Sequence, residues 1–435
     1  TLPHRYLILT DNREYLMEYI NKIIQGNCLD SLKTLPENSV DAIVTDPPYG
    51  LSFMGKKWDY DVPSQEIWEE CLRVLKPGGY LLAFAGTRTQ HRMAVRIEDA
   101  GFEIRDMIAW VYGSGFPKSL NIGKVMDKYL KTGNASWNGT GDSSNGALGY
   151  SKLQHNQGYR PADYSNKHQN KEEITEDLAK KWEGWGTALK PALEPITVAR
   201  KPLGEKTVAE NCLKWGVGGI DIDGSRVEGI PPSVPQPSFG IKKAEIYNFA
   251  TGEGRNGEMS NSTQGRFPAN LIHDGSQEVL DLFPQSGNGK RAVSFHKPSE
   301  NTCMSGANLG HTTVSNIGDS GSAARFFYCA KASKSERNRG CEELEEKKVS
   351  DGREKEADNA FQRGKTLRSN THPTVKPIAL MEYLVKLVSK EDAIILDPFT
   401  GSGSTLVACK NLNRNYIGME LDPEYIKIAE ARLNV

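Results

Sequence analysis

The sequence predicts an α/β protein built on a doubly wound, mostly parallel sheet. Between residues 23 and 110, apolar strand patterns alternate with helical patterns. The tail from 377 to 435 continues with helix, strand, helix, strand and helix. Because alternating strands and helices fold into parallel sheets covered on both faces, we expect the two regions to join in one sheet. In the first region the expected strands are 40–46, 79–85 and 103–111, and the expected helices are about 64–75 and 88–100.

The first strand ends in Asp46-Pro47-Pro48-Tyr49. Two consecutive prolines forbid both helix and ladder pairing, so the strand stops there. A carboxylate, a rigid turn and an aromatic ring therefore lie together at the carboxyl end of a strand. This set suits the exocyclic amine of a planar base, because Asp46 and the Pro47 carbonyl can accept its two hydrogens while Tyr49 stacks on the ring. The alternative is a strand-terminating turn with a packed tyrosine.

The next elements have clear ends. The helix at 64–75 is ended by Lys76-Pro77-Gly78-Gly79, and the helix at 88–100 is ended by Gly101. Much later, residues 194–200 read as a strand that returns to the core sheet.

A second polar motif follows a strand near the end of the chain. Residues 393–397 form a buried-strand pattern that leads into a glycine-rich turn, 398–405, and a helical stretch at 406–412. Strand, glycine-rich turn and helix are typical of sites for nucleotide-like cofactors at the edge of a parallel sheet. The following strand, 416–420, ends in Glu420, and an acid at that place commonly accepts hydrogen bonds from ribose hydroxyls. The alternative for the turn is a simple helix start.

Together the motifs resemble those of the DNA amino-methyltransferases, which transfer a methyl group from S-adenosylmethionine to adenine N6 or cytosine N4. DPPYG at 46–50 resembles their catalytic motif, and DPFTGSGST at 397–405 resembles their cofactor motif. HPTVKP at 372–377 resembles the segment that precedes the cofactor motif in permuted members, and this motif order is that of the β group. The resemblance covers 23–118 and 365–435, with a weaker stretch near 185–204. It implies a Rossmann-like methyltransferase fold.

The resemblance also implies roles for individual residues. Asp46, Pro47, Pro48 and Tyr49 are the expected catalytic residues, acting on a base that is flipped out of the duplex. Phe53 and Trp58 are either second walls of that base pocket or packing residues. The residues expected to bind S-adenosylmethionine are Asn27, Cys28, Asp46, Thr374, Lys376, Asp397, Phe399, Gly401, Ser402, Gly403, Ser404, Thr405 and Glu420.

Some of these cofactor assignments are more specific than others. Thr374 and Lys376 match the segment that meets the methionine carboxylate. Asn27 stands where many relatives carry Asp, so it keeps the capacity to hydrogen-bond the cofactor's adenine. Asp30 either takes over that contact or caps the following helix.

Composition agrees with an enzyme of the cytoplasm. The chain has 435 residues, of which 37% are hydrophobic and 25% charged. No apolar run approaches the roughly 20 residues that span a bilayer, so we expect no contact with a membrane. Seven cysteines without a CxxC pair argue against a zinc ribbon and a disulfide scaffold, and we expect no metal.

The expected partner is double-stranded DNA, although the net charge is only −1. Phosphate binding needs a local basic face rather than a basic chain. Arg325, Lys331 and Lys334 lie in a stretch that mixes cations with aromatic residues, and we expect them to contact DNA; a solvated surface is the alternative. A homodimer and a partner endonuclease are both left open.

The chain divides into five predicted regions. Residues 23–118 and 366–435 are the catalytic and cofactor halves of the core, and 185–204 is the return strand. Residues 119–184 are expected to form a mobile loop, because 133–172 is rich in Gly, Asn, Ser and Gln. The target-recognition insert is expected at 205–365, with short strand signals at 245–249, 293–296 and 325–330.

The expected reaction is N6 methylation of adenine. The amine's lone pair is conjugated with the ring, and a carboxylate with a carbonyl on its two hydrogens favours a pyramidal, nucleophilic nitrogen. Family members acting on cytosine N4 more often open the catalytic motif with Ser and those acting on adenine with Asp, so Asp46 predicts adenine. The alternatives are cytosine N4, a methyltransferase acting on RNA or a protein amide, and a catalytically silent DNA-binding relative.

Overall fold

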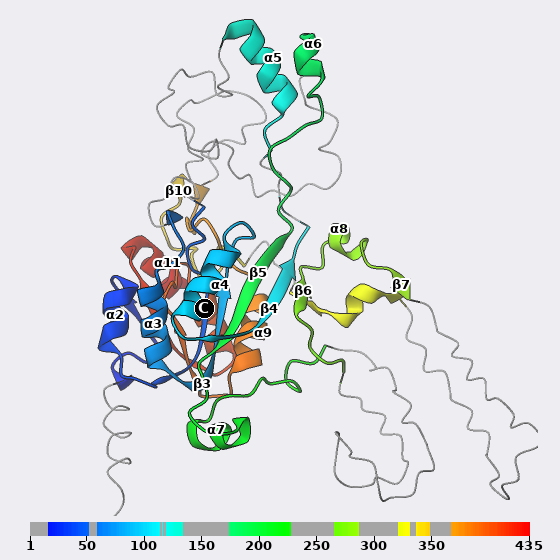
Figure 1. Cartoon of the computed structure of the whole chain (residues 1–435). Helices are drawn as coiled ribbons and strands as arrows, with labels where there is room; N and C mark the ends of the chain where they lie inside the picture. Colours follow the sequence, from blue (N-terminus) through cyan, green and yellow to red (C-terminus); the bar gives the residue numbers. More distant parts are fainter. Residues whose placement is uncertain are drawn as a thin grey trace, which may run out of the picture.

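A computed structural model describes residues 16–51, 59–113, 115, 119–133, 174–227, 265–286, 321–330, 336–348 and 367–435. These residues form one nine-stranded sheet in the order β1-β13-β12-β2-β3-β5-β4-β6-β9. Within it β5 runs antiparallel to both neighbours, and the other pairs are parallel. The predicted α/β class with a doubly wound, mostly parallel sheet is therefore confirmed (Figure 1).

The strands of the sheet are β1 Lys22–Gln25, β2 Val40–Thr45, β3 Leu75–Phe84, β4 Glu103–Val111, β5 Leu193–Arg200, β6 Leu271–His273, β9 Tyr328–Cys329, β12 Ile394–Asp397 and β13 Asn415–Glu420. Two small antiparallel pairs lie outside it: β7 Gln285–Ser286 with β8 Gly321–Ser322, and β10 Lys347–Lys348 with β11 Leu367–Arg368. The helices are α2 Cys28–Thr34, α3 Gln65–Val74, α4 Gln90–Asp99, α5 Ile122–Thr132, α6 Asp177–Lys180, α7 Val208–Trp215, α8 Gln277–Leu280, α9 Ile378–Val388, α10 Ser404–Asn411 and α11 Pro423–Leu433, with a 3₁₀ turn, η4, at Ala323–Phe326.

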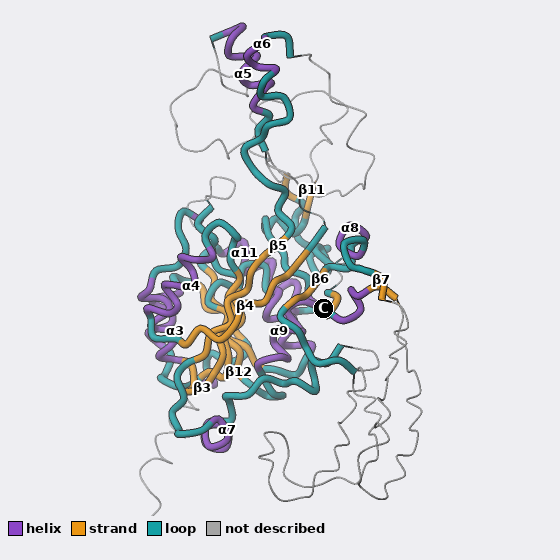
Figure 2. The backbone as a smooth tube through the Cα atoms, turned by 45° about the vertical axis from the view of Figure 1, so that its right-hand side comes forward, coloured by secondary structure: helices purple, strands orange, loops and turns teal. Residues whose placement is uncertain are grey.

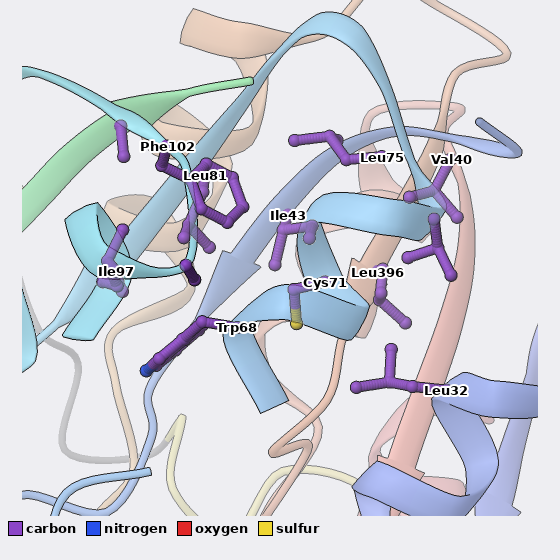
Figure 3. Packing of buried hydrophobic residues seen from close by; sticks show 14 of the residues in the cluster. Leu32, Val40, Ile43, Trp68, Cys71, Leu75, Leu81, Ile97, Phe102 and Leu396 are labelled. Carbon is purple, nitrogen blue, oxygen red and sulfur yellow. The ribbon is translucent and has the colours of Figure 1, made fainter. Parts of the chain in front are cut away.

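Side chains of each strand alternate between two cores, one on each face of the sheet. In β3, Leu81 and Ala83 enter one core, whereas Leu82 and Phe84 enter the other. Helices α2, α3 and α4 close the first core, where Trp68 is completely buried (Figure 3). Helices α9 and α10 close the second. This two-sided burial explains why the central strands read as continuous apolar runs.

The two ends of the chain join in one sheet, as predicted, and their strands interleave. Strands β12 and β13 from the C-terminal region lie between β1 and β2 from the N-terminal region. The carboxyl ends of β2, β12 and β13 therefore share one edge of the sheet. In an open α/β sheet this is the edge where ligands bind.

Two local predictions need correction. Strand β3 begins at Leu75 rather than 79, because the chain passes directly from α3 into the strand and the proline and glycines are accommodated at an irregularity in the β2–β3 register. The strand expected at 325–330 is instead the 3₁₀ turn η4 followed by the two-residue β9. The strand signals at 245–249 and 293–296 lie outside the described residues.

The described parts of the two inserts contain regular elements. Helices α5 and α6 stand where 119–184 was predicted to be a mobile loop, and both views place them beyond the ends of β4 and β5 (Figures 1 and 2). The 205–365 region contributes β6 and β9 to the main sheet and packs α7 against β3. The five predicted regions remain a prediction as functional units. No helix among the described residues is long and apolar enough to cross a membrane.

Candidate active site

The two sequence motifs meet at the edge of the sheet. Asp46 directly follows β2, Asp397 ends β12, and these two strands are paired neighbours. The Thr45 hydroxyl donates a hydrogen bond of 2.6 Å to Asp397 Oδ1. Residues more than 350 positions apart in the chain are thus joined at this point.

The DPPY turn is held in place by Asp59, which is 2% exposed. Its Oδ1 accepts hydrogen bonds from the Tyr49 and Gly50 amides at 2.7 and 2.9 Å, and its Oδ2 accepts one from the Leu51 amide at 3.2 Å. The Thr89 hydroxyl donates to the Tyr49 carbonyl at 2.6 Å. The turn is fixed by charge-assisted hydrogen bonds rather than by its prolines alone.

Four ionisable side chains cluster beside this turn. Lys376 Nζ lies 2.7 Å from Asp46 Oδ2 and 3.2 Å from Glu194 Oε2. The Tyr49 hydroxyl lies 2.7 Å from Asp46 Oδ1 and 3.0 Å from Glu194 Oε2. Glu194 comes from the start of β5, whose antiparallel direction brings its amino end to the edge where the parallel strands finish. Three distant segments of the chain therefore build one cluster.

The environment fixes the protonation of two members of the cluster. Burial, reinforced by the charges of Asp46 and Glu194, raises the pKa of Tyr49 well above its usual value. For Lys376, burial lowers the pKa, but the two carboxylates outweigh burial and the net shift is upward. Near neutral pH the cluster thus holds a phenol and an ammonium.

The glycine-rich turn forms the neighbouring half of the site. Gly403 precedes α10 with a left-handed backbone (φ +75°), and no side chain caps that helix. Glu420 ends β13 and accepts hydrogen bonds from the Gly401 amide at 2.8 Å and the Asp422 amide at 2.9 Å. This half of the site fits a ligand that contains both a nucleoside and an amino acid. The Glu420 carboxylate can accept hydrogen bonds from hydroxyl groups, and the uncapped N-terminus of α10 can bind an anion. The half-buried ring of Phe399 lies beside them in the turn.

Two buried groups in this half have shifted pKa values. Burial raises the pKa of Asp397 to about 6, although hydrogen bonds from Thr45 and Thr405 oppose the shift. Burial lowers the pKa of His372 to about 4, although the hydrogen bond to the Thr374 carbonyl opposes the shift, and the ring packs edge-on against Tyr425.

Several predicted cofactor residues have other contacts in the structure. The Asn27 side chain caps α2 through the Leu29 amide at 2.9 Å, so the cap is Asn27 rather than Asp30. The hydroxyls of Ser402 and Ser404 both accept hydrogen bonds from the buried Arg432. Burial raises the pKa of the Cys28 thiol to about 11. Cofactor binding by these residues, and by Thr374 near His372, remains a prediction.

Lys376 differs most from its expected place. It was expected at the methionine carboxylate, but its contacts are with Asp46, Tyr49 and Glu194. Phe53, Trp58, Lys331 and Lys334 lie outside the described residues. Arg325 donates two hydrogen bonds of 2.6 Å to the Gly321 and Ser322 carbonyls, which favours a structural role, and DNA contact by this residue remains a prediction.

Sequence reasoning missed Glu194 and Asp59. Glu194 was recognised only as the first residue of a return strand. The structure adds the direction of that strand: β5 runs antiparallel, so it starts at the edge where its parallel neighbours end. Nothing in the local pattern around Asp59 predicts that its carboxylate would hold the turn at Tyr49.

Two solved structures are similar to this chain at low sequence identity. The M1.HpyAVI–SAM complex is 16% identical, with a TM-score of 0.35, over 95% of this chain and 99% of that chain. The cytosine-N4-specific PvuII DNA methyltransferase is 12% identical, with a TM-score of 0.39, over 94% of this chain and 85% of that chain.

Curated relatives match over a short stretch. Type II methyltransferase M.HindIII of Haemophilus influenzae is 50% identical over 64 residues, which are 15% of this chain and 21% of that protein. Type II methyltransferase M2.LlaDCHI of Lactococcus lactis subsp. cremoris is 49% identical over 63 residues, which are 14% of this chain and 23% of that protein. The matched part is thus less than a quarter of either relative.

A family model matches a much longer part of this chain than the curated relatives do. It is the N6/N4 methyltransferase model, described as DNA methylase, and it matches residues 40–431, which include both motifs and the four-residue cluster. The chain therefore belongs to the N6/N4 DNA methylase family.

Proposed function

We propose that this chain is a DNA methyltransferase that transfers a methyl group from S-adenosylmethionine to adenine N6 of a flipped-out base in double-stranded DNA. The observation that carries the proposal is the hydrogen bond between Thr45 and Asp397. It brings Asp46, the carboxylate proposed to bind the acceptor, next to the glycine-rich turn proposed to bind the donor. Membership of the N6/N4 DNA methylase family supports the proposal, and the opening Asp46 favours adenine over cytosine.

The chain's own residues would act mainly by positioning. Glu420 and the N-terminus of α10 would hold the donor, which supplies an electrophilic methyl group. Asp46 and the Pro47 carbonyl would accept the two amine hydrogens, turning the nitrogen lone pair toward that methyl group. Such groups, fixed before the reaction, stabilise a transition state at no reorganisation cost. The Tyr49 ring would stack on the base.

The test is methylation of duplex DNA in vitro with labelled S-adenosylmethionine, followed by mass spectrometry of the nucleosides. We expect N6-methyladenine from the wild type. Asp46→Ala should lose activity at least a hundredfold, because correct positioning of the reactants lowers the activation free energy by several kcal/mol. Donor binding by Asp46→Ala should stay within about tenfold, because Asp46 acts on the acceptor.

Asp99→Ala is the matched control, because Asp99 is an exposed carboxylate at the end of α4. N4-methylcytosine as the main product would overturn the choice of base and leave the donor site standing. Normal activity in Asp46→Ala would remove Asp46 from its proposed role.

A further inference from the structure

The ammonium group of Lys376 is fully occupied within the acceptor half of the site. An ammonium has three hydrogens, and three oxygens surround this one: Asp46 Oδ2 at 2.7 Å, Tyr49 Oη at 3.1 Å and Glu194 Oε2 at 3.2 Å. The side chain is only 7% exposed. These contacts leave no hydrogen for a donor carboxylate.

The same contacts occupy the carboxylate that the reaction needs. Asp46 Oδ1 accepts from the Tyr49 hydroxyl, and Oδ2 accepts from Lys376, both at 2.7 Å. An ammonium hydrogen and an amine hydrogen make the same kind of hydrogen bond to a carboxylate. Lys376 therefore fills one of the roughly four acceptor positions of this carboxylate and competes with an entering exocyclic amine for Asp46 Oδ2.

Glu194 offers the ammonium a second place close by. Its Oε2 is already 3.2 Å from Lys376 Nζ and 3.0 Å from Tyr49 Oη, and the Tyr112 hydroxyl also hydrogen-bonds to the side chain. Releasing Asp46 would leave Lys376 beside an opposite charge, so the ammonium would not become an unpaired buried cation. The ring of Phe84, whose centre is 4.8 Å from Nζ, adds a favourable contact.

We propose that Lys376 is an acceptor-site positioning residue that holds Asp46 in the free enzyme, and that Glu194 is the counter-ion that keeps the ammonium when the target amine takes its place. The inference rests on the proposed function and adds two residues to it. It also changes the expected role of Lys376, from contact with the donor to control of the acceptor.

The formal charges of the three groups give a distinctive test. Asp46, Glu194 and Lys376 sum to −1 in the wild type. The sum becomes 0 in Glu194→Gln and −2 in Lys376→Met, and it returns to −1 in the double variant. If the net charge of these three groups controls the reaction, the second substitution should restore part of the activity that the first substitution removes.

We expect Glu194→Gln to lower kcat/KM for DNA by about thirtyfold, mainly through KM, because Lys376 then has only Asp46 as a charged partner. The Glu194→Gln, Lys376→Met double variant should recover at least about tenfold of that loss, a non-additive result typical of groups in direct contact. A residue with a merely structural role would make the double variant worse than either single variant.

Donor binding provides the second readout and does not depend on turnover. Calorimetry with S-adenosylhomocysteine should give a Kd for Lys376→Met within about threefold of the wild type, because Lys376 touches only acceptor-side groups. Lys390→Met and Glu391→Gln are matched charge-loss controls on exposed residues just after α9. Thermal unfolding is followed for every variant, and Lys376→Gln replaces Lys376→Met if the latter does not fold.

Two results would overturn the inference. One is a loss of S-adenosylhomocysteine affinity above about thirtyfold in a folded Lys376 variant, which would place this residue at the donor. The other is a double variant no more active than Glu194→Gln. An inactive wild type would count against the proposed function, whereas failed recovery beside an active wild type counts against this inference alone.

Discussion

His372 links the segment that leads to Lys376 with the glycine-rich turn. A Cβ added to Gly401 would lie 2.7 Å from His372 Nε2, so the ring fills the space left by the missing side chain. The Nδ1 atom lies 2.5 Å from the Thr374 carbonyl, which fixes the segment leading to Lys376. One buried ring therefore supports both halves of the site.

The lowered pKa of His372 predicts a pH-dependent contribution to stability. Its pKa is about 4 in the folded protein and 6.5 as the unperturbed value. Because the folded value is the lower one, the contribution is complete above pH 6.5 and is lost as the pH falls through 4. His372→Gln should therefore flatten the pH dependence of the free energy of unfolding in this window, by up to about 1.4 kcal/mol per pH unit.

Denaturant unfolding at several pH values checks this prediction. Asp397 contributes with the opposite sign: its raised pKa of about 6 means that stability is lost as the pH rises from 3.8 through 6. The comparison of His372→Gln with the wild type isolates the histidine, because Asp397 is present in both. Parallel pH profiles would contradict the assignment.

The residue types present at the edge of the sheet could be predicted from the sequence, but the contacts between them could not. The carboxylate of Asp46 and the aromatic ring of Tyr49 follow from four consecutive letters, and so does the proline-terminated strand. The two carboxylates that contact Lys376 could not be predicted from neighbouring letters of the sequence. Its contact with Asp46 joins positions 330 residues apart, and that with Glu194 depends on a strand direction that the sequence leaves open.

At the scale of elements, the start of α10 depends on Gly403. Its φ of +75° is unfavourable for other residues, and an added Cβ would lie 2.9 Å from Ala429 Cβ on α11. Gly133, at the end of α5, has a similar φ of +68° but no atom within 4 Å of an added Cβ. Substitution at Gly133 therefore tests backbone strain alone, whereas substitution at Gly403 tests strain and steric overlap together.

Gly133→Ala should cost only the left-handed backbone penalty, about 1–2 kcal/mol of unfolding free energy. Gly403→Ala should cost clearly more, and it should also weaken binding of S-adenosylhomocysteine by at least about tenfold, since the turn must shift away from α11. Thermal unfolding and calorimetry on the two variants are the measurements. Equal costs, with donor binding unchanged in both, would show that contact with α11 does not constrain the turn.

Elements with a local signal were predicted well. Helix α10 follows its glycine-rich turn and α4 ends close to Gly101, whereas α3 ends at Val74, before the expected glycines, which lie in β3. The addition of β6 and β9 to the sheet was missed, because strands of three and two residues have too short a pattern to distinguish from turns.

At the scale of the whole molecule, the interleaved strand order ties the two ends of the chain together. Backbone hydrogen bonds join β1 to β13 and β12 to β2, and α9 contributes seven buried side chains. These contacts do not require an unbroken chain between residues 348 and 367. Cleavage at a protease site inserted there should leave the two pieces associated.

Gel filtration without denaturant should show the cleaved protein as one species that still binds S-adenosylhomocysteine, with the uncut insertion variant as the control. Residues 367–435 expressed alone should not fold, because β12 and β13 would lose β2 and β1. Separation of the pieces after cleavage would mean that the strand pairing is too weak to hold the molecule together.

The strand order also has a consequence for synthesis on the ribosome. Strand β2 is complete about 350 residues before β12, the neighbour that must pair with its open edge. At 5–20 residues per second, translation leaves that edge unpaired for roughly 17–70 s. The nascent chain therefore presents an apolar strand that could pair wrongly with another chain. Maturation of this protein should depend on chaperones more strongly than that of a protein whose central strands are made in succession.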